Sequence, residues 1–452
     1  MISADELTKR VDASFPAEIE FLSELVAIPS VSSDPSKTEE LQRSAEFVRD
    51  TMQSLGFDAQ ILRAPMPNGE PGRPAVVASS PRVEGRPTVL LYAHHDVQPA
   101  GDEARWSSDP FTAEIRDGRI YGRGTSDDGA GIAVHVAALR AFDGELPVNV
   151  VVFVEGEEEV GSPSFSAFLE KYRELLAADV IIVADSGNWT TQIPAITSSL
   201  RGVATVDVTV RVLDHAVHSG MFGGPVLDAM TLASRLVATL HDDEGNVAVA
   251  GLGGTPTAEV EWSEQDYRRD ASVVDGYQLA GTADLAARVW TMPAISVIGV
   301  DATSVADAAN AIIPVAKVRL SLRTVPGSST AESAAALRRH LVDNAPFGAQ
   351  VEVSVEEEGP AYVADLDSRE AGMLREVLTE AFGEPAVAIG QGGSIPFIAE
   401  FERVFPDSTV LVTGVEDPAT NAHSEDESQS LSVLRGATLA EALLLRRFGE
   451  EA

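Results

Sequence analysis

A series of apolar, β-branched runs that alternate with helix-like segments constrains the fold of this chain more than any other feature. Residues 148–157 (VNVVVFVEGE) and 179–186 (DVIIVADS) are two such runs, and an apolar, alanine-rich helix pattern at residues 128–142 precedes them. Continuous apolar strands are typical of a parallel sheet that is buried on both faces. The alternation therefore predicts an α/β fold, with a mostly parallel sheet and helices on both of its faces.

The pattern changes after residue 200. Residues 202–212 (GVATVDVTVRV) alternate between apolar and polar side chains, and strand-like runs at residues 311–326 and 349–358 flank a helix pattern at residues 330–344. Strict alternation indicates a sheet with one solvent-exposed face. A chain of 452 residues also exceeds what one hydrophobic core usually supports. We therefore predict an α/β domain of residues 1–200 and 361–452, interrupted by an inserted α+β sandwich domain of residues 201–360.

The charge balance and the absence of cysteine exclude several classes of function. The chain has 70 Asp and Glu against 33 Lys and Arg, which gives a net charge of −37. This excess argues against nucleic acid and an anionic membrane as partners, because phosphate groups need a basic surface. Without cysteine, any metal site must use His, Asp and Glu. No segment has the length of a membrane span or the form of a signal peptide, so we expect a cytoplasmic protein.

Polar clusters follow the predicted buried strands. They contain His94 and Asp96, the glutamates of residues 155–159, Asp185, and His423, while Asp127 comes just before a predicted helix. Because parallel strands deliver their carboxyl ends to one edge of the sheet, these side chains should meet there. Crowded carboxylates and imidazoles are costly to bury without a cation. The sequence thus predicts a metal site.

The set of donors suits two divalent metal ions. Zinc accepts imidazole nitrogen and carboxylate oxygen, and manganese or cobalt also tolerates these donors. One bridging carboxylate would hold two ions about 3.5–4 Å apart, with room for a shared hydroxide. In the adjacent pair Glu158 and Glu159, one carboxylate could bind metal while the other takes the proton of the attacking water.

Eight short motifs give the chain a resemblance to a known family. In chain order they are YAHHDVQP, YGRGTSDDGAG, EGEEEVGS, VADS, VHSGMFGG, SLRTVP, GGSIP and AHSEDE, and they span residues 92–427. The chain resembles the metallopeptidase family that includes cytosolic non-specific dipeptidase, carnosine dipeptidase, glutamate carboxypeptidase, succinyl-diaminopimelate desuccinylase and acetylornithine deacetylase. Its motifs are most similar to those of the dipeptidase branch.

The resemblance implies a role for each residue of the metal site. His94 and Asp185 would bind one metal, and Glu159 and His423 the other. Asp127 would bridge the two ions. Glu158 would be the general base, and Asp96 would orient the imidazole of its metal-binding neighbour two residues earlier.

The resemblance implies that the inserted domain is a lid and dimerisation domain, with contacts to the substrate and to a second subunit. His218 would reach into the active site of the partner subunit of a homodimer and stabilise the oxyanion there. Arg323 would hold the carboxylate of a small peptide, and Ser394, Gly392 and Gly393 would contact the same group. Gly390 and Gln391 stand where dipeptidases usually carry an Arg-Glu pair, so the substrate's identity stays open.

Each of these residues also has an ordinary structural interpretation. His94 could be a core histidine, residues 155–159 a solvated loop, Asp127 a helix N-cap, His218 part of a turn, and Arg323 an exposed strand residue. The function predicted first is metal-dependent hydrolysis of dipeptides. The alternatives are an N-acyl-amino-acid deacylase or desuccinylase of the same family and, less favoured, a dimeric binding protein without catalysis.

Overall fold

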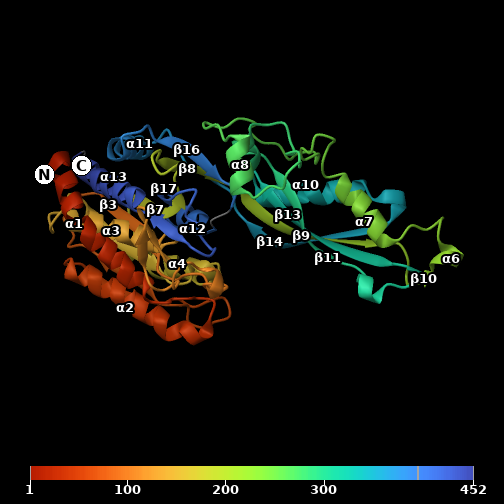
Figure 1. The fold of residues 1–452 in the computed structure, drawn as a ribbon, viewed down its shortest axis with the longest axis horizontal. Coiled ribbons are helices and arrows are strands. Elements are labelled where there is room, and N and C mark those ends of the chain that lie inside the picture. The colour runs from red at the N-terminus through yellow and green to blue at the C-terminus, as the bar shows by residue number, and fades with distance from the viewer. Residues whose placement is uncertain (1, 394–395, 451–452) are drawn as a thin grey trace. The chain divides into compact units, whose positions relative to one another are not determined.

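The computed structural model describes residues 2–393 and 396–450, which form two compact units (Figure 1). The α/β unit comprises Met1–Ser198, Ala364–Ala388 and Phe397–Ala452, and the inserted unit comprises Ser199–Val363 and Ile389–Pro396. The short segment that ends at Pro396 thus clusters with the inserted unit, although the sequence placed it in the α/β domain. The role of the inserted unit as a lid and dimerisation domain stays a prediction.

The α/β unit is built on the predicted sheet, whose central strands are parallel. Their order is β6 (Asn149–Glu155), β3 (Thr88–His94), β7 (Val180–Gly187) and β17 (Thr409–Glu416). Antiparallel strands extend the sheet at its edges: β1 (Asp58–Leu62), β2 (Ala75–Ser79), β8 (Ala195–Leu200) and β15 (Tyr362–Val363). A further strand, β16 (Val387–Gln391), pairs with β8. A separate small sheet holds β4 (Glu114–Arg116), β5 (Arg119–Tyr121) and β18 (Ser428–Ser430).

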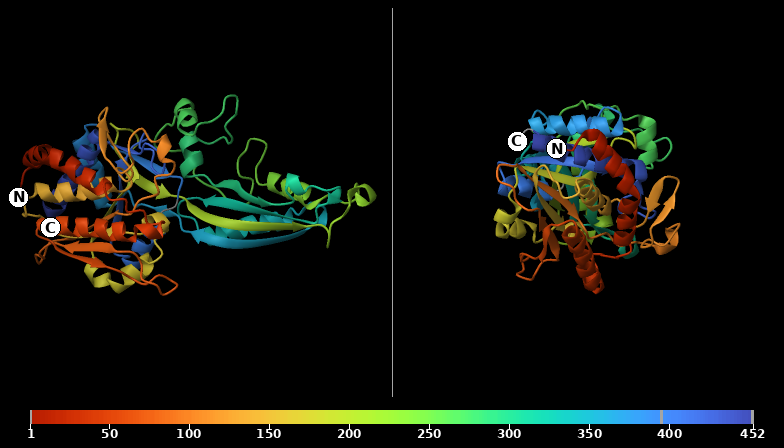
Figure 2. Two further views of the ribbon diagram at one scale, coloured as in Figure 1. Left: turned by 60° about the horizontal axis from the view of Figure 1, so that its bottom comes forward. Right: turned by 90° about the vertical axis from the view of Figure 1, so that its left-hand side faces the viewer.

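Helices cover both faces of this sheet, because side chains along each strand alternate between the faces. On β3, Leu91 and Ala93 join a large aliphatic core with the helices α1 (Ala4–Val26), α2 (Thr38–Ser54), α3 (Gly129–Ala141), α11 (Arg369–Phe382) and α13 (Leu431–Glu450). Tyr92 instead packs against phenylalanines of α4 (Phe165–Lys171) and α12 (Pro396–Val404). The short α5 (Arg173–Leu176) follows α4. Figure 2 shows these helices around the sheet, as the sequence predicted.

The inserted unit contains a four-stranded antiparallel sheet. Its order is β11 (Ala294–Asp301), β13 (Val315–Thr324), β9 (Gly202–Arg211) and β14 (Gln350–Gly359). The helices α7 (Ala229–Ala238) and α10 (Thr330–Asp343) pack through a second aliphatic core on one face, which confirms an α+β arrangement. Residues 241–291 form a long connection between α7 and β11. It contains two short helices, α8 (Glu264–Asp270) and α9 (Leu285–Trp290), that the sequence did not indicate. Two more strands, β10 (Val217–His218) and β12 (Ala311–Ile312), pair beside α6 (Ser219–Phe222).

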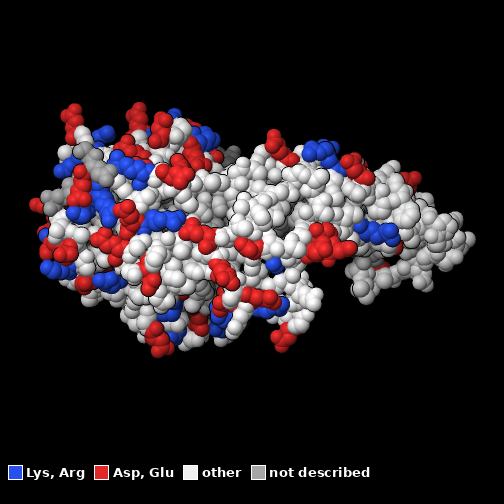
Figure 3. Space-filling view, turned by 90° about the horizontal axis from the view of Figure 1, so that it is seen from above, with Lys and Arg blue, Asp and Glu red and all other residues white. Residues whose placement is uncertain are grey.

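The surface carries many charged groups. On the face of the α/β unit in Figure 3, acidic and basic side chains lie interspersed, and the inserted unit shows larger uncharged areas on the same side. Among the helices of residues 2–393 and 396–450, none combines the length and apolar character that a membrane span requires.

Candidate metal centre

The carboxyl edge of the parallel sheet brings together the five predicted metal ligands. His94 is the last residue of β3, Asp185 lies near the end of β7, and His423 follows β17. Asp127 precedes α3, and Glu159 lies in the short 3-10 turn Glu158–Val160 after β6. Five segments that are far apart in the sequence therefore meet at one place, because parallel strands end at the same edge.

The carboxylate of Asp127 is shared between two groups of side chains. Its Oδ1 lies 3.0 Å from Nε2 of His94, and its Oδ2 lies 2.8 Å from Nε2 of His423. Glu159 Oε2 approaches the same His423 nitrogen at 3.2 Å, and Asp185 Oδ2 lies 4.0 Å from Nε2 of His94. One oxygen of Asp127 thus faces each imidazole, which is the geometry that a bridging carboxylate requires.

The charges of this cluster favour a cation. Burial, together with the negative charges of Asp127 and Glu159, raises the pKa of Asp185 to about 7, although the charge of His94 opposes this shift. Hydrogen bonds to Asp127 and Glu159 raise the pKa of His423 to about 11. Acids that resist ionisation and an imidazole that resists deprotonation are the response of a crowded anionic site. Two imidazole nitrogens and three carboxylates are also donors that zinc accepts.

Glu158 lies beside the cluster without joining it. Burial raises the pKa of its carboxyl well above the usual range, and the charges of Asp185 and Asp127 add to this effect. Its side chain makes no hydrogen bond to any residue in the described part of the chain, so the carboxylate is available for a proton. The neighbouring Glu159, in contrast, is held by Gln98, whose side-chain nitrogen donates to Oε2 at 2.7 Å.

Asp96 orients both parts of the cluster. Its Oδ1 and Oδ2 accept the backbone N–H groups of Glu158 and Glu159, each at 3.1 Å. Its Oδ1 also lies 3.5 Å from Nδ1 of His94, and that nitrogen is 2.9 Å from the carbonyl oxygen of Asp96. With Nδ1 engaged in this way, His94 presents Nε2 to Asp127 and Asp185. Asp96 therefore positions both the turn that carries Glu158 and Glu159 and the imidazole of His94.

Comparisons with known proteins assign the chain to a family. The sequence profile of peptidase family M20/M25/M40 matches residues 90–447. The chain belongs to this family. Cysteinylglycine-S-conjugate dipeptidase of Corynebacterium striatum is 34% identical over 436 residues, with 95% of each chain covered. Beta-Ala-His dipeptidase of Homo sapiens is 28% identical over 436 residues, which cover 90% of this chain and 85% of the human protein.

A solved structure supports the fold of this M20/M25/M40 family member. The dipeptidase Dug1p of Saccharomyces cerevisiae matches with a TM-score of 0.78 at 24% identity, and the match covers 99% of each chain. The resemblance to a metallopeptidase family and to its dipeptidase branch is therefore confirmed.

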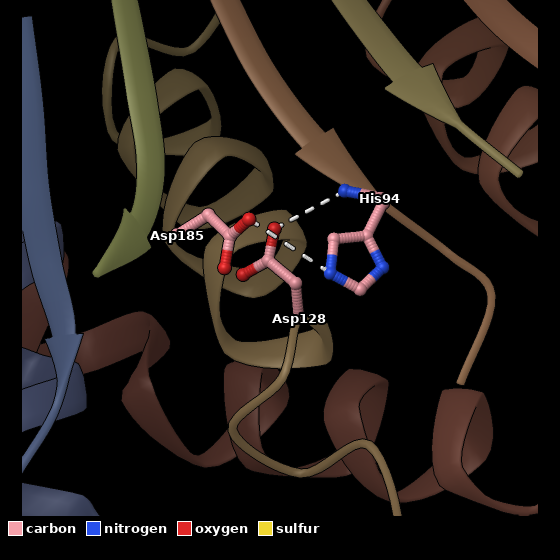
Figure 4. A group of neighbouring side chains, drawn as sticks. All are labelled: His94, Asp128 and Asp185. Atoms are coloured by element: carbon pink, nitrogen blue, oxygen red, sulfur yellow. Dashed lines mark hydrogen bonds and ion pairs between the residues drawn. The ribbon is translucent and has the colours of Figure 1, made fainter. Parts of the chain in front are cut away.

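Asp128 is a site residue whose role the sequence did not predict. Its Oδ1 accepts the backbone N–H of Gly131, so Asp128 is the N-cap of α3, and the N-cap interpretation of Asp127 is wrong. Its Oδ2 accepts the backbone N–H of His94 at 3.1 Å. Figure 4 shows the Asp128 carboxylate beside Asp185 and His94, and ligand atoms of these three residues lie within 4.8 Å of one another. Since backbone donors occupy both oxygens, Asp128 fixes the loop rather than serving as a free ligand.

A buried ion pair holds the loop that carries Asp127. The carboxylate of Glu427 accepts a hydrogen bond from Nη1 of Arg123 at 2.5 Å and lies in the interior with it. The other oxygen of Glu427 accepts the backbone N–H groups of Ser126 and Asp127 at 3.0 and 3.2 Å. No local pattern could have revealed this pair, because its members are 304 residues apart.

The glutamate run of residues 155–159 is not a solvated loop. Glu155 is buried and accepts a hydrogen bond from the hydroxyl of Tyr92 at 2.7 Å, and burial raises its pKa to about 8. Glu157 is also buried and accepts the backbone N–H groups of Arg73 and Ser164. The run therefore divides into two structural acids and the two acids of the site.

The inserted unit holds the other predicted residues. His218 is exposed, and its Nδ1 accepts the backbone N–H of Gly220 at 3.0 Å. Arg323 lies in β13 and is partly buried, and Gly392 and Gly393 follow β16. Ser394 lies outside the described residues. The roles proposed for these residues in substrate and oxyanion binding stay predictions.

Proposed function

We propose that this chain is a metal-dependent dipeptidase with two divalent metal ions per subunit, and that zinc is its preferred metal. The observation that carries the proposal is the carboxylate of Asp127, one oxygen of which faces His94 and the other His423. The named activities of the relatives support it, since the proteins from Corynebacterium striatum and Homo sapiens are both dipeptidases. Titratable groups with shifted pKa values that gather at one place are typical of a functional site.

The residues of the cluster divide between the two ions. His94 and Asp185 would hold one ion, Glu159 and His423 the other, and Asp127 both. When bound, the two ions would polarise the scissile carbonyl and make the attacking water more acidic. Glu158 takes the proton from that water and delivers it to the nitrogen of the leaving amine. The raised pKa of Glu158 suits this role, because the carboxyl can hold a proton between the two steps.

The inserted unit supplies the remaining groups of the proposed reaction. Arg323 binds the free carboxylate of the dipeptide with help from Gly392, Gly393 and Ser394. His218 donates a hydrogen bond to the oxyanion in the active site of the partner subunit. Its geometry fits a donor, because Nδ1 accepts from Gly220 and the proton therefore resides on Nε2.

The proposal includes a homodimer and a cytoplasmic location. Edge strand β11 supports the dimer, since Val297, Ile298 and Val300 are each 45–57% exposed along it. The opposite edge, β14, is instead protected by glutamates, as isolated edges usually are. Sedimentation should therefore give twice the mass of 47.7 kDa. A chain without cysteine is compatible with a reducing compartment.

A substrate panel with controlled metal tests the activity. The purified protein is stripped with a chelator and reloaded separately with zinc, manganese or cobalt. Each form is then assayed on unmodified dipeptides and on N-acetyl and N-succinyl amino acids. We expect hydrolysis of the dipeptides that disappears on chelation and returns with metal. Turnover restricted to the acylated amino acids would establish the deacylase alternative, and no hydrolysis with any metal would favour the binding protein.

A further inference from the structure

Arg201 and Arg323 lie at one end of the inserted sheet, where the positive charge of Arg323 acts on Arg201. Along β9 and β13, Ala204 and Leu322 point into the core, so the paired residues Val203 and Arg323 point to the opposite face. Arg201 comes two residues before Val203, and the positive charge of Arg323 acts on its guanidinium. Two cationic side chains therefore share one end of this face.

Farther along the same face, two cations share a protein carboxylate. Asp207 is buried beneath Arg319 and Lys317. Its two oxygens accept hydrogen bonds from Nε and Nη2 of Arg319 at 2.6 and 2.8 Å, and Nζ of Lys317 lies 2.5 Å away. Charge on this part of the sheet is thus largely balanced within the chain.

Arg201 has no carboxylate partner among the described residues, although it is only 8% exposed. Its Nε donates to the carbonyl oxygen of Gly392 at 3.2 Å, and its Nη1 donates to those of Arg288 and Met292, both at 3.4 Å. Carbonyl groups orient the guanidinium but carry no net charge. Burial and the charge of Arg323 lower the pKa of Arg201 to about 10. Burial of a cation without an anion beside it costs desolvation free energy, and a ligand with a negative charge would offset that cost.

The surroundings of Arg201 leave one nitrogen accessible. Nη2 makes no hydrogen bond within the described residues, while Nε and Nη1 are held by the three carbonyls. A side chain at position 392 would put its Cβ 3.0 Å from Nη2, and the glycine there keeps this space clear. The guanidinium is therefore fixed in direction, with a free donor beside Gly392.

We propose that Arg201 and Arg323 together bind the free C-terminal carboxylate of the dipeptide, with Arg201 as the buried and rigid member. This inference rests on the proposed function and adds a residue to it. Guanidinium groups match the planar carboxylate, and a side chain already held in place loses little entropy on binding. The substrate class is thereby restricted to peptides with a free terminal carboxylate. Peptide amides lack this anion and are poor substrates.

The test compares alanyl-glycine with alanyl-glycinamide. Wild type, Arg201→Met and Arg319→Met are assayed for kcat and KM on both compounds. In Arg201→Met, kcat/KM for the acid should fall about 10- to 100-fold, mainly through KM, because a charge-assisted hydrogen bond is lost. For the amide, kcat/KM should change by less than about 3-fold. Arg319→Met is the matched control, since its arginine already has a carboxylate partner, and it should alter neither substrate.

The outcomes separate this inference from the function on which it rests. If wild type hydrolyses neither compound, the proposed function fails. The inference is overturned if wild type hydrolyses alanyl-glycine and alanyl-glycinamide equally well. It is also overturned if kcat/KM of Arg201→Met falls by the same factor for both compounds, because Arg201 then has only a structural role. Should Arg201→Met not fold, Arg201→Lys keeps the charge, and it should still lose about 3- to 10-fold on the acid alone. Equal losses on both substrates in Arg201→Lys would overturn the inference too.

Discussion

The two units of this protein each contain unbalanced charge, and the signs are opposite. In the α/β unit, Asp127, Asp185 and Glu159 crowd around two imidazoles, and burial holds Asp185 toward its neutral form. In the inserted unit, Arg201 is buried against carbonyl oxygens beside a second arginine. The sign of the unbalanced charge supports the ligand proposed for each unit: a cation for the acids and a carboxylate for the arginines.

Two other groups of buried charges find partners within the described chain. Arg123 pairs with Glu427, and Asp207 with Arg319 and Lys317. These pairs hold loops and strands in place, and they need no ligand. The comparison therefore teaches that a charge buried without a protein partner marks a binding position, whereas a balanced pair marks a structural one.

Replacement of the shared carboxylate should have the largest effect. In Asp127→Asn, the bridge between His94 and His423 loses its charge, so both ions should bind weakly. We expect metal content well below that of wild type and an activity decrease of about 10³-fold or more. Metal analysis by mass spectrometry and a dipeptidase assay measure this. If the variant kept the metal content and activity of wild type, the acidic cluster would not be the metal site.

Removal of the proposed base should leave the metals in place. Glu158→Gln keeps the shape of the side chain but cannot accept a proton, so kcat should fall about 10²- to 10⁴-fold. Metal content and melting temperature should match wild type, because within the described residues Glu158 forms hydrogen bonds only through its backbone. Near-normal turnover would show that another group accepts the proton.

A change at Asp96 should produce a smaller loss. Asp96→Asn retains an acceptor for only one of the two backbone N–H groups at residues 158 and 159. Since the residue acts through the ligands it orients, we expect metal affinity or activity to fall about 10- to 100-fold. Titration with a competing chelator gives the affinity. An affinity and activity equal to those of wild type would show that the turn is held by other contacts.

Glu18 offers the mildest test, because it is a buried acid far from any proposed ligand. Burial raises its pKa to about 8, and the hydroxyl of Thr438 donates to its carboxyl. At pH 4 both folded and unfolded forms are protonated. As pH rises from 4.5 to 8, only the unfolded form ionises, so the free energy of unfolding of wild type should decrease.

Glu18→Gln should remove this dependence on pH. Relative to wild type, the variant should gain about 1–3 kcal/mol between pH 5 and pH 8. Urea unfolding of both proteins at the two pH values, with chelated metal, gives the difference. A constant difference between the proteins would mean that Glu18 ionises in the folded state.

The sequence predicted the strands that carry the site, because each strand has a local hydrophobic pattern. Apolar runs located β3, β6, β7 and β17, and the polar residues that end them are the ones that meet. The edge strand β11 and the helices α8 and α9 were not anticipated, because their short segments lack a clear hydrophobic period.

Residues that depend on distant partners could not be found in this way. Glu427 pairs with Arg123 across 304 positions, and Arg201 contacts Gly392 across 191. The sequence offered Asp127 as the N-cap of α3, and only the geometry assigned that role to Asp128. These positions carry no periodicity or spacing of their own, so tertiary contacts alone identify them.

Anomalous X-ray diffraction from crystals grown with zinc tests the shared carboxylate most directly. Two peaks about 3.5–4 Å apart should lie on either side of Asp127, one next to His94 and Asp185 and the other next to His423 and Glu159. A single peak, or two peaks that do not share Asp127, would contradict the two-metal site and the hydrolytic mechanism built on it.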